Sequence, residues 1–163
     1  MRKILVVVFM LVAMSSFAEW TVSDRVDPMD DTRIVDLVGI TDETTDTGEW
    51  QALVLRSRSD ETFEAFVVWG SYFSEYEPVS VTVRIDNQTP FNLSANAGVN
   101  GTVLFFRIPF LFIYSAINAK ERILVRATTM RGTVETIEFR MEGAQELFDR
   151  YSDMFPTDLP TDE

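Results

Sequence analysis

The sequence predicts a mainly β protein, an antiparallel β-sandwich or curled sheet of about eight strands with two short helices. Short runs of alternating apolar and polar residues recur along most of the chain, with turn residues between them. Only two stretches show the spacing of an amphipathic helix. Many short strands joined by tight turns are typical of antiparallel sheets, so this class follows.

The clearest alternation lies at residues 79–86, VSVTVRID. Val81 and its alternate neighbours are expected to face the core. Arg84 and Asp86 would share the outward face, about 7 Å apart along the strand. We interpret them as residues of a solvated face that form an exposed ion pair with each other or with a neighbouring strand, worth roughly 0–1 kcal/mol. A binding role for the two residues is the alternative.

Other alternating runs predict the remaining strands. Residues 50–57 and 62–69 are expected to pair as a hairpin, as are residues 122–130 and 133–141. Residues 102–107 are apolar on both faces, which predicts a central strand. Further strands are expected at 33–40 and, as a short extended piece, around 91–93.

Helical spacing begins after Pro109, a residue suited to the first position of a helix. Its expected apolar stripe consists of Phe110, Ile113, Tyr114 and Ile117. Core packing is the favoured interpretation of this stripe, and a contact surface is the alternative. A second helix is expected after Gly143, with Ala144, Leu147, Phe148 and Tyr151 on one stripe.

The first 18 residues have the pattern of a cleavable signal peptide. A basic start is followed by an apolar run at residues 4–14, and Ser16 and Ala18 precede the expected cut. The run is shorter than the roughly 20 residues that span a bilayer, so no stable membrane span is expected after cleavage. We predict a periplasmic or secreted protein with one domain at residues 19–152 and a disordered acidic tail at residues 153–163.

The composition excludes several kinds of chemistry. The chain contains no cysteine and no histidine, which removes thiol nucleophiles, histidine bases and zinc sites built from these residues. The formal net charge of −12 argues against nucleic acid as a partner, because so acidic a protein repels phosphate backbones. No cofactor is expected.

The order of several short motifs resembles the VasI/TagO group of type VI secretion accessory proteins and their wider relatives. An early Trp and an Asp-Pro-Met-x-Asp segment precede an Arg-x-Asp strand, a Leu-x-Val-Arg strand and a Phe-x-x-x-Gly segment that leads into the last helix. The resemblance implies an accessory role and supplies no catalytic residue; the cysteines typical of the group are absent here. The matching residues are Trp20, Asp27, Pro28, Met29, Asp31, Arg84, Asp86, Leu124, Val125, Arg126, Phe139 and Gly143.

An aromatic connection, GSYFSEYEP, follows the strand that ends at Trp69. Exposed aromatic side chains offer rigid apolar area to a protein or sugar partner. The predicted binding residues are Trp69, Tyr72, Phe73, Tyr76, Phe110, Tyr114, Arg84 and Asp86. Closure of one end of the core by the same aromatic side chains is the competing interpretation.

Two further sites rest on acidic residues. Asp27, Asp30 and Asp31 could gather oxygen ligands for calcium, although the spacing is not that of an EF-hand loop. A solvated acidic turn is the simpler interpretation. Carboxylate pairs chosen among Glu64, Glu75, Glu77 and Asp86 could serve glycoside hydrolysis.

Taken together, these features favour an exported, non-catalytic accessory module that binds another envelope protein. A domain that binds a small ligand or calcium at the acidic turn is the alternative. A carboxylate-based hydrolase is the third hypothesis.

Overall fold

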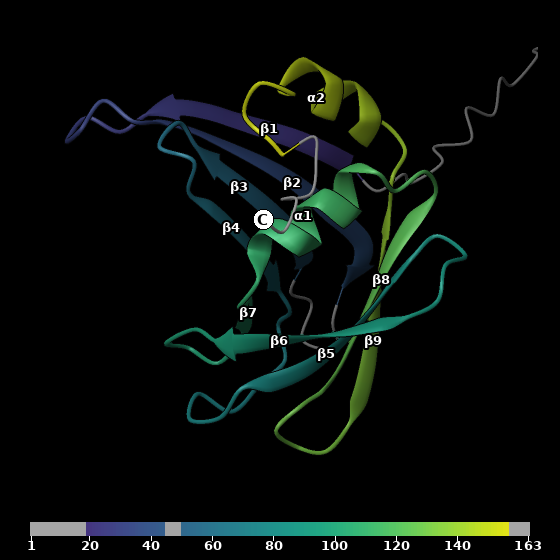
Figure 1. The fold of residues 1–163 in the computed structure, drawn as a ribbon. Helices are drawn as coiled ribbons and strands as arrows, with labels where there is room; N and C mark the ends of the chain where they lie inside the picture. The colour runs from purple at the N-terminus through teal and green to yellow at the C-terminus, as the bar shows by residue number, and fades with distance from the viewer. Residues whose placement is uncertain (1–18, 45–49, 157–163) are drawn as a thin grey trace, which may run out of the picture.

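The computed structural model describes residues 19–44 and 50–156, in which the chain forms nine strands and two helices (Figure 1). The predicted signal peptide lies outside the described residues. The elements are β1 (Glu19–Val26), β2 (Arg33–Thr44), β3 (Trp50–Arg58), β4 (Phe63–Val68), β5 (Val79–Ile85), β6 (Phe91–Ala97), β7 (Val103–Phe106), α1 (Pro109–Ile117), β8 (Arg122–Thr128), β9 (Val134–Arg140) and α2 (Ala144–Arg150).

All nine strands belong to one antiparallel sheet, in the order β1-β2-β3-β4-β7-β6-β5-β8-β9. The sheet curls into a half-barrel, so that β2 and β9 come into contact although they are far apart in the strand order (Figure 1). The natural twist of neighbouring strands produces this curl in a large sheet. Of the two predicted architectures, the curled sheet is the one observed.

The concave face of the half-barrel holds the core. In β5, Val81, Val83 and Ile85 are buried as the alternation predicted, and the intervening residues face outward. The same inward pattern continues on every central strand. Fully or almost fully buried strand residues on this face include Val35, Leu37, Leu53, Leu55, Val67, Leu104, Ile123, Val125, Ile137 and Phe139.

A tryptophan joins the two edge strands. The indole N–H of Trp20 on β1 donates to the carbonyl of Arg140, the last residue of β9, over 2.7 Å. Its ring also meets Phe148 of α2 edge to face, with 5.7 Å between ring centroids. Gly39 on β2 lies beneath the ring, because a Cβ there would come within 2.8 Å of it. The missing side chain therefore makes room for the indole.

The helices and the C-terminal segment cover the open side of the half-barrel. Helix α1 contacts β4 and β7, and α2 contacts β1. After α2, Met154 and Phe155 are buried, and the hydroxyl of the buried Ser57 donates to the carbonyl of Met154. The predicted disordered tail from residue 153 is wrong for these residues: the two apolar side chains extend the domain to Phe155. Residues 157–163 lie outside the described residues.

Helix α1 buries a different face from the one predicted. Phe112, Ile113 and Ala116 are fully buried, whereas Phe110 and Tyr114 are only half-buried. Phe112 stacks on the Phe106 ring, with 4.1 Å between centroids and 14° between planes. This contact rotates the helix relative to the apolar stripe, which in so apolar a segment could not be assigned from spacing alone.

Strands β2 and β6 are longer than predicted, β1 was not predicted as a strand, and the central strand lies where it was expected. Strand β2 continues past its predicted end at residue 40 to Thr44, and β6 runs to Ala97. Strand β1 occupies Glu19–Val26, where the sequence shows only a short apolar alternation at Trp20 and Val22. Strand β7 lies fifth in the strand order, between β4 and β6, which confirms the central position predicted from its apolar faces.

Candidate functional site

Three connections meet at one end of the half-barrel, which is the lower end in Figure 1. We call the surface that they form the loop end. The connections are residues 69–78 between β4 and β5, 98–102 between β6 and β7, and 129–133 between β8 and β9. Backbone hydrogen bonds join them: the Phe73 N–H donates to the Gly101 carbonyl, and the Met130 N–H to the Tyr72 carbonyl, both over 2.8 Å. Segments distant in sequence thus form one surface.

The aromatic connection divides into two buried and two exposed side chains. Trp69 and Phe73 pack edge to face in the core, with 5.2 Å between ring centroids. They cannot touch a partner, so their assignment as binding residues is wrong. Tyr72 and Tyr76 are 61% and 95% exposed. The sequence indicated two roles for these aromatic residues, core closure and partner binding, but it could not show which residue has which role.

Glu135 holds Trp69 in place. This carboxylate of β9 accepts the indole N–H of Trp69 over 2.7 Å and the hydroxyl of Ser71 over 2.9 Å. Because β4 and β9 are not neighbours in the sheet, the contact closes the half-barrel at the loop end, as Trp20 does at the other end. The exposed tyrosines therefore stand on a connection whose base is anchored in the core.

The neighbouring turns add exposed apolar side chains that the sequence analysis did not identify. Val99, Met130 and Val134 are 92%, 73% and 62% exposed. Each is a single apolar residue in a polar turn or at a strand end, so only the spatial meeting of the three connections shows that they lie at the same end of the molecule. Together with Tyr72 and Tyr76, they give the loop end its apolar character.

Asp86 has a structural role rather than the one predicted. It directly follows β5 and has a positive φ of 48°. Its carboxylate accepts the backbone N–H groups of Lys120, Glu121 and Arg122 over 2.9, 2.7 and 3.0 Å. Among the described residues it has no ion pair with Arg84. The predicted pair is therefore wrong, because the chain turns at Asp86 and its carboxylate faces the start of β8.

The hydrogen bonds explain the acidity of Asp86. Burial disfavours its charged form, but the bonds from the three backbone amides outweigh burial and lower the pKa of the carboxyl below its ordinary value. A carboxylate used in this way is unavailable as a general acid. Glu64 forms an ion pair with Arg56 over 3.0 Å on the outer face of β4. Glu64 and Asp86 belong to strands three places apart, roughly 14 Å, so these two do not form a glycosidase pair.

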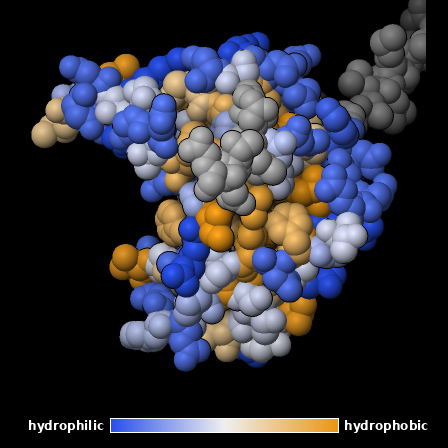
Figure 2. Space-filling view, in the orientation of Figure 1, coloured by the Kyte–Doolittle hydropathy of each residue, from blue (hydrophilic) through white to orange (hydrophobic). Residues whose placement is uncertain are grey.

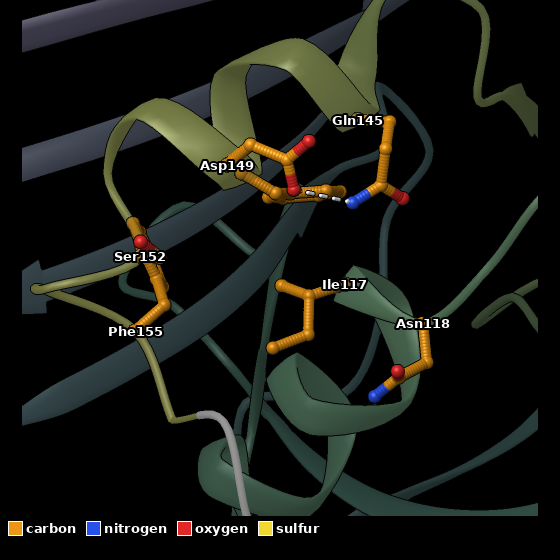
Figure 3. Close-up of a pocket in the computed structure, with 7 residues that line it drawn as sticks. Ile117, Asn118, Gln145, Asp149, Ser152 and Phe155 are labelled. Atoms are coloured by element: carbon orange, nitrogen blue, oxygen red, sulfur yellow. Dashed lines mark hydrogen bonds between the residues drawn. The ribbon is translucent and has the colours of Figure 1, made fainter.

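Helix α1 presents half-buried apolar residues at the mouth of the half-barrel, among them the predicted contact residues Phe110 and Tyr114. Figure 2 shows hydrophobic residues in the centre of the view, where Figure 1 places this helix. A hollow of about 170 Å³ separates α1 from α2, with Ile117 and Asn118 facing Gln145 and Asp149 (Figure 3). Phe110 packs edge to face on Phe63 of β4. In the hollow, Gln145 donates to the Asp149 carboxylate over 3.0 Å, and Asn118 donates to the Tyr114 carbonyl over 2.8 Å.

The acidic turn uses its carboxylates locally. Asp27 accepts the Met29 amide and Asp30 the Thr32 amide, both over 3.0 Å. Within the described residues, no group of three or more acidic side chains is arranged to hold a metal ion. These are the hydrogen bonds of Asx turns, in which an Asp side chain bonds the amide two residues later. The described residues of the turn therefore give no support to the calcium hypothesis.

Comparisons with known proteins define the fold. No family model matches the chain, and no curated protein matches it, so the resemblance to type VI secretion accessory proteins stays a prediction. The chain is similar in structure to invasion associated protein B from Bartonella henselae, known from a crystal structure. The TM-score is 0.52 at 10% sequence identity, over 85% of this chain and 94% of that protein. At this identity the likeness shows a shared fold.

Proposed function

We propose that this protein is an exported, non-catalytic accessory module that binds a protein partner through the loop end. The observation that carries the proposal is the gathering of exposed apolar side chains there, on connections that hydrogen bonds hold together. Large exposed aromatic side chains are typical anchors of protein interfaces. Anchored loops also lose little conformational entropy when they bind.

Three further features support this role. The leader pattern at residues 1–18 favours export to the periplasm or beyond. No helix among the described residues has the length and hydrophobicity needed to cross a membrane. The structural neighbour carries the name of an invasion associated protein, which suits an accessory role better than a catalytic one. Another envelope protein is the proposed partner.

Site-specific photocrosslinking in exporting cells tests the loop end. A photoreactive benzoylphenylalanine replaces Tyr76, and in a matched control it replaces Val26, which is 58% exposed on β1. We expect one defined protein adduct from position 76 and none from position 26. The adduct should disappear when Tyr72→Ser and Met130→Ser are added, because both substitutions remove apolar area from the same surface.

The identified partner then allows a quantitative measurement. Titration calorimetry with the purified partner should show a loss of about 2 kcal/mol or more, roughly 30-fold, for Tyr72→Ser with Tyr76→Ser. Equal crosslinking from positions 76 and 26 would contradict the proposal. So would an unchanged affinity in the double variant.

A further inference from the structure

The outer faces of β5, β8 and β9 carry four arginines around a single glutamate. Strand register places Arg84 of β5 diagonally between Arg122 and Arg126 of β8. On β9, Arg140 lies opposite Arg122, and Glu138 lies between the two ends of the group. We call Arg84, Arg122, Arg126 and Arg140 the arginine patch. Neighbouring strands are about 4.8 Å apart, so these side chains can reach one ligand.

Strands β1 to β3, at the other side of the sheet, show that arginines elsewhere in this protein do not cluster without acidic partners. On β1, β2 and β3, every arginine forms an ion pair with an acidic side chain. Arg25 and Arg56 both bond Asp36, over 2.7 and 2.6 Å. Arg33 pairs with Asp24 over 2.9 Å. In a chain of net charge −12, acidic partners are abundant.

On the arginine patch, acidic side chains neutralise only a small part of the positive charge. Among the residues that the structure describes, neither Arg84 nor Arg126 forms an ion pair, and the Arg126 Nε donates instead to the Thr136 hydroxyl. Arg122 and Arg140 share Glu138 over long distances of 3.5 and 3.6 Å. The patch therefore keeps a net positive charge on the surface of a strongly acidic protein.

Two of its donors are also unsatisfied. The Nε atoms of Arg84 and Arg122 are buried and have no hydrogen-bond partner. A buried donor without a partner costs free energy unless a ligand supplies an acceptor. Planar guanidinium groups match the two oxygens of a carboxylate. The excess positive charge and the unused donors thus both indicate a ligand that carries carboxylates.

We propose that the arginine patch binds an acidic peptide segment of a partner protein, as a second contact separate from the loop end. Figure 1 places β8 and β9 along the right-hand flank, which Figure 2 shows as largely hydrophilic. Arg126 is exposed and Arg140 is 56% exposed at its side chain, so an extended segment has access to both.

The overall charge favours a short acidic segment over larger polyanions. Electrostatic interactions in physiological salt decay over about 8 Å, so a few carboxylates on the patch feel mainly the arginines. A nucleic acid or an anionic membrane would extend beyond the patch, where the acidic remainder of the protein repels it. The patch is therefore assigned to a local ligand.

Fluorescence anisotropy with the full-length protein tests this proposal. The probe is a labelled peptide of alternating glutamate and glycine, and the reference is the glutamine–glycine peptide. We expect binding of the acidic peptide only, weakened at least about tenfold by Arg84→Gln with Arg126→Gln. Arg58→Gln removes the same kind of charge from a paired arginine of β3 and should leave affinity unchanged.

Other outcomes would overturn the proposal. They are an unchanged affinity in the double variant, an equal loss in Arg58→Gln, or preferential binding to vesicles of phosphatidylcholine and phosphatidylglycerol. Self-association that the double substitution abolishes, seen by sedimentation, would assign the patch to a second copy instead. Circular dichroism confirms folding. If the double variant unfolds, Arg126→Gln alone decides, because this exposed side chain can be replaced without disturbing the core.

Discussion

Asp86 shows how a residue can look functional in sequence and serve the fold. Its carboxylate receives three backbone amides at the start of β8, and its own N–H donates to the Arg122 carbonyl over 2.9 Å. Aspartate also tolerates the left-handed backbone conformation found here. Alternation correctly placed Arg84 on the outer face, but it could not show that the strand ends one residue before Asp86.

Replacing Asp86 by asparagine should destabilise the domain. Asparagine keeps the tolerance for positive φ but loses the negative charge that three amides bond. We expect the free energy of unfolding at neutral pH to fall by about 1–3 kcal/mol. Urea denaturation followed by circular dichroism measures it. Thr82→Ala on the same strand, an outward position, is the control and should change stability much less.

The same contact predicts a pH dependence. Because the pKa of Asp86 is lower in the folded than in the unfolded protein, its contribution is complete above the unfolded value, about 3.9, and disappears as pH falls through the folded value. The stability difference between the wild type and Asp86→Asn should therefore shrink below about pH 4. Denaturation curves at several pH values test this, and a difference that persists in acid would contradict it.

At the scale of elements, the contact between β1 and β2 depends on the indole of Trp20 lying over Gly39. Trp20 faces the core beside Gly39 in the strand register, and the glycine leaves the space that its ring occupies. Only Trp20 and Val22 alternate here in the sequence, which was too little to predict a strand. Neither the length of β1 nor the long-range bond to Arg140 could be inferred, because both depend on how far the sheet curls.

Gly39→Ala should lower the free energy of unfolding by about 1–3 kcal/mol, because an added methyl group overpacks the Trp20 ring. In a Trp20→Ala background the same change should cost much less. A double-mutant cycle measured by chemical denaturation gives the coupling between the two sites. Additive effects would show that the close approach does not limit stability.

Prediction of elements from sequence succeeded where local pattern decides structure. The alternation in β5 and the glycine before α2 were sufficient for those elements. Prediction failed where tertiary contacts decide the structure. Packing against Phe106 determines which face of α1 is buried, and Ser57 donates a hydrogen bond to Met154, which lies almost a hundred residues later in the chain. The roles of Trp69 and Tyr76 could be separated only once Glu135 was placed in space.

The whole molecule is a single curled sheet that side-chain contacts close at both ends. Trp20 joins the edge strands β1 and β9 near α2, and Trp69, which follows the inner strand β4, bonds Glu135 of the edge strand β9 at the loop end. The C-terminal segment fills part of the open side. Without disulfides, this closure and the buried concave face must supply the rigidity of the domain. We conclude that this closure holds the three connections together as one preformed surface.

Hydrogen exchange by NMR measures how firmly the three connections are held together. The amides of Phe73 and Met130 donate between connections of the loop end. They should exchange as slowly as amides in the middle of β5, and Glu135→Ala should accelerate them while leaving β5 unaffected. Rapid exchange of both amides in the wild type would show that the loop end is not preformed. It would then lack the fixed arrangement that its proposed binding role requires.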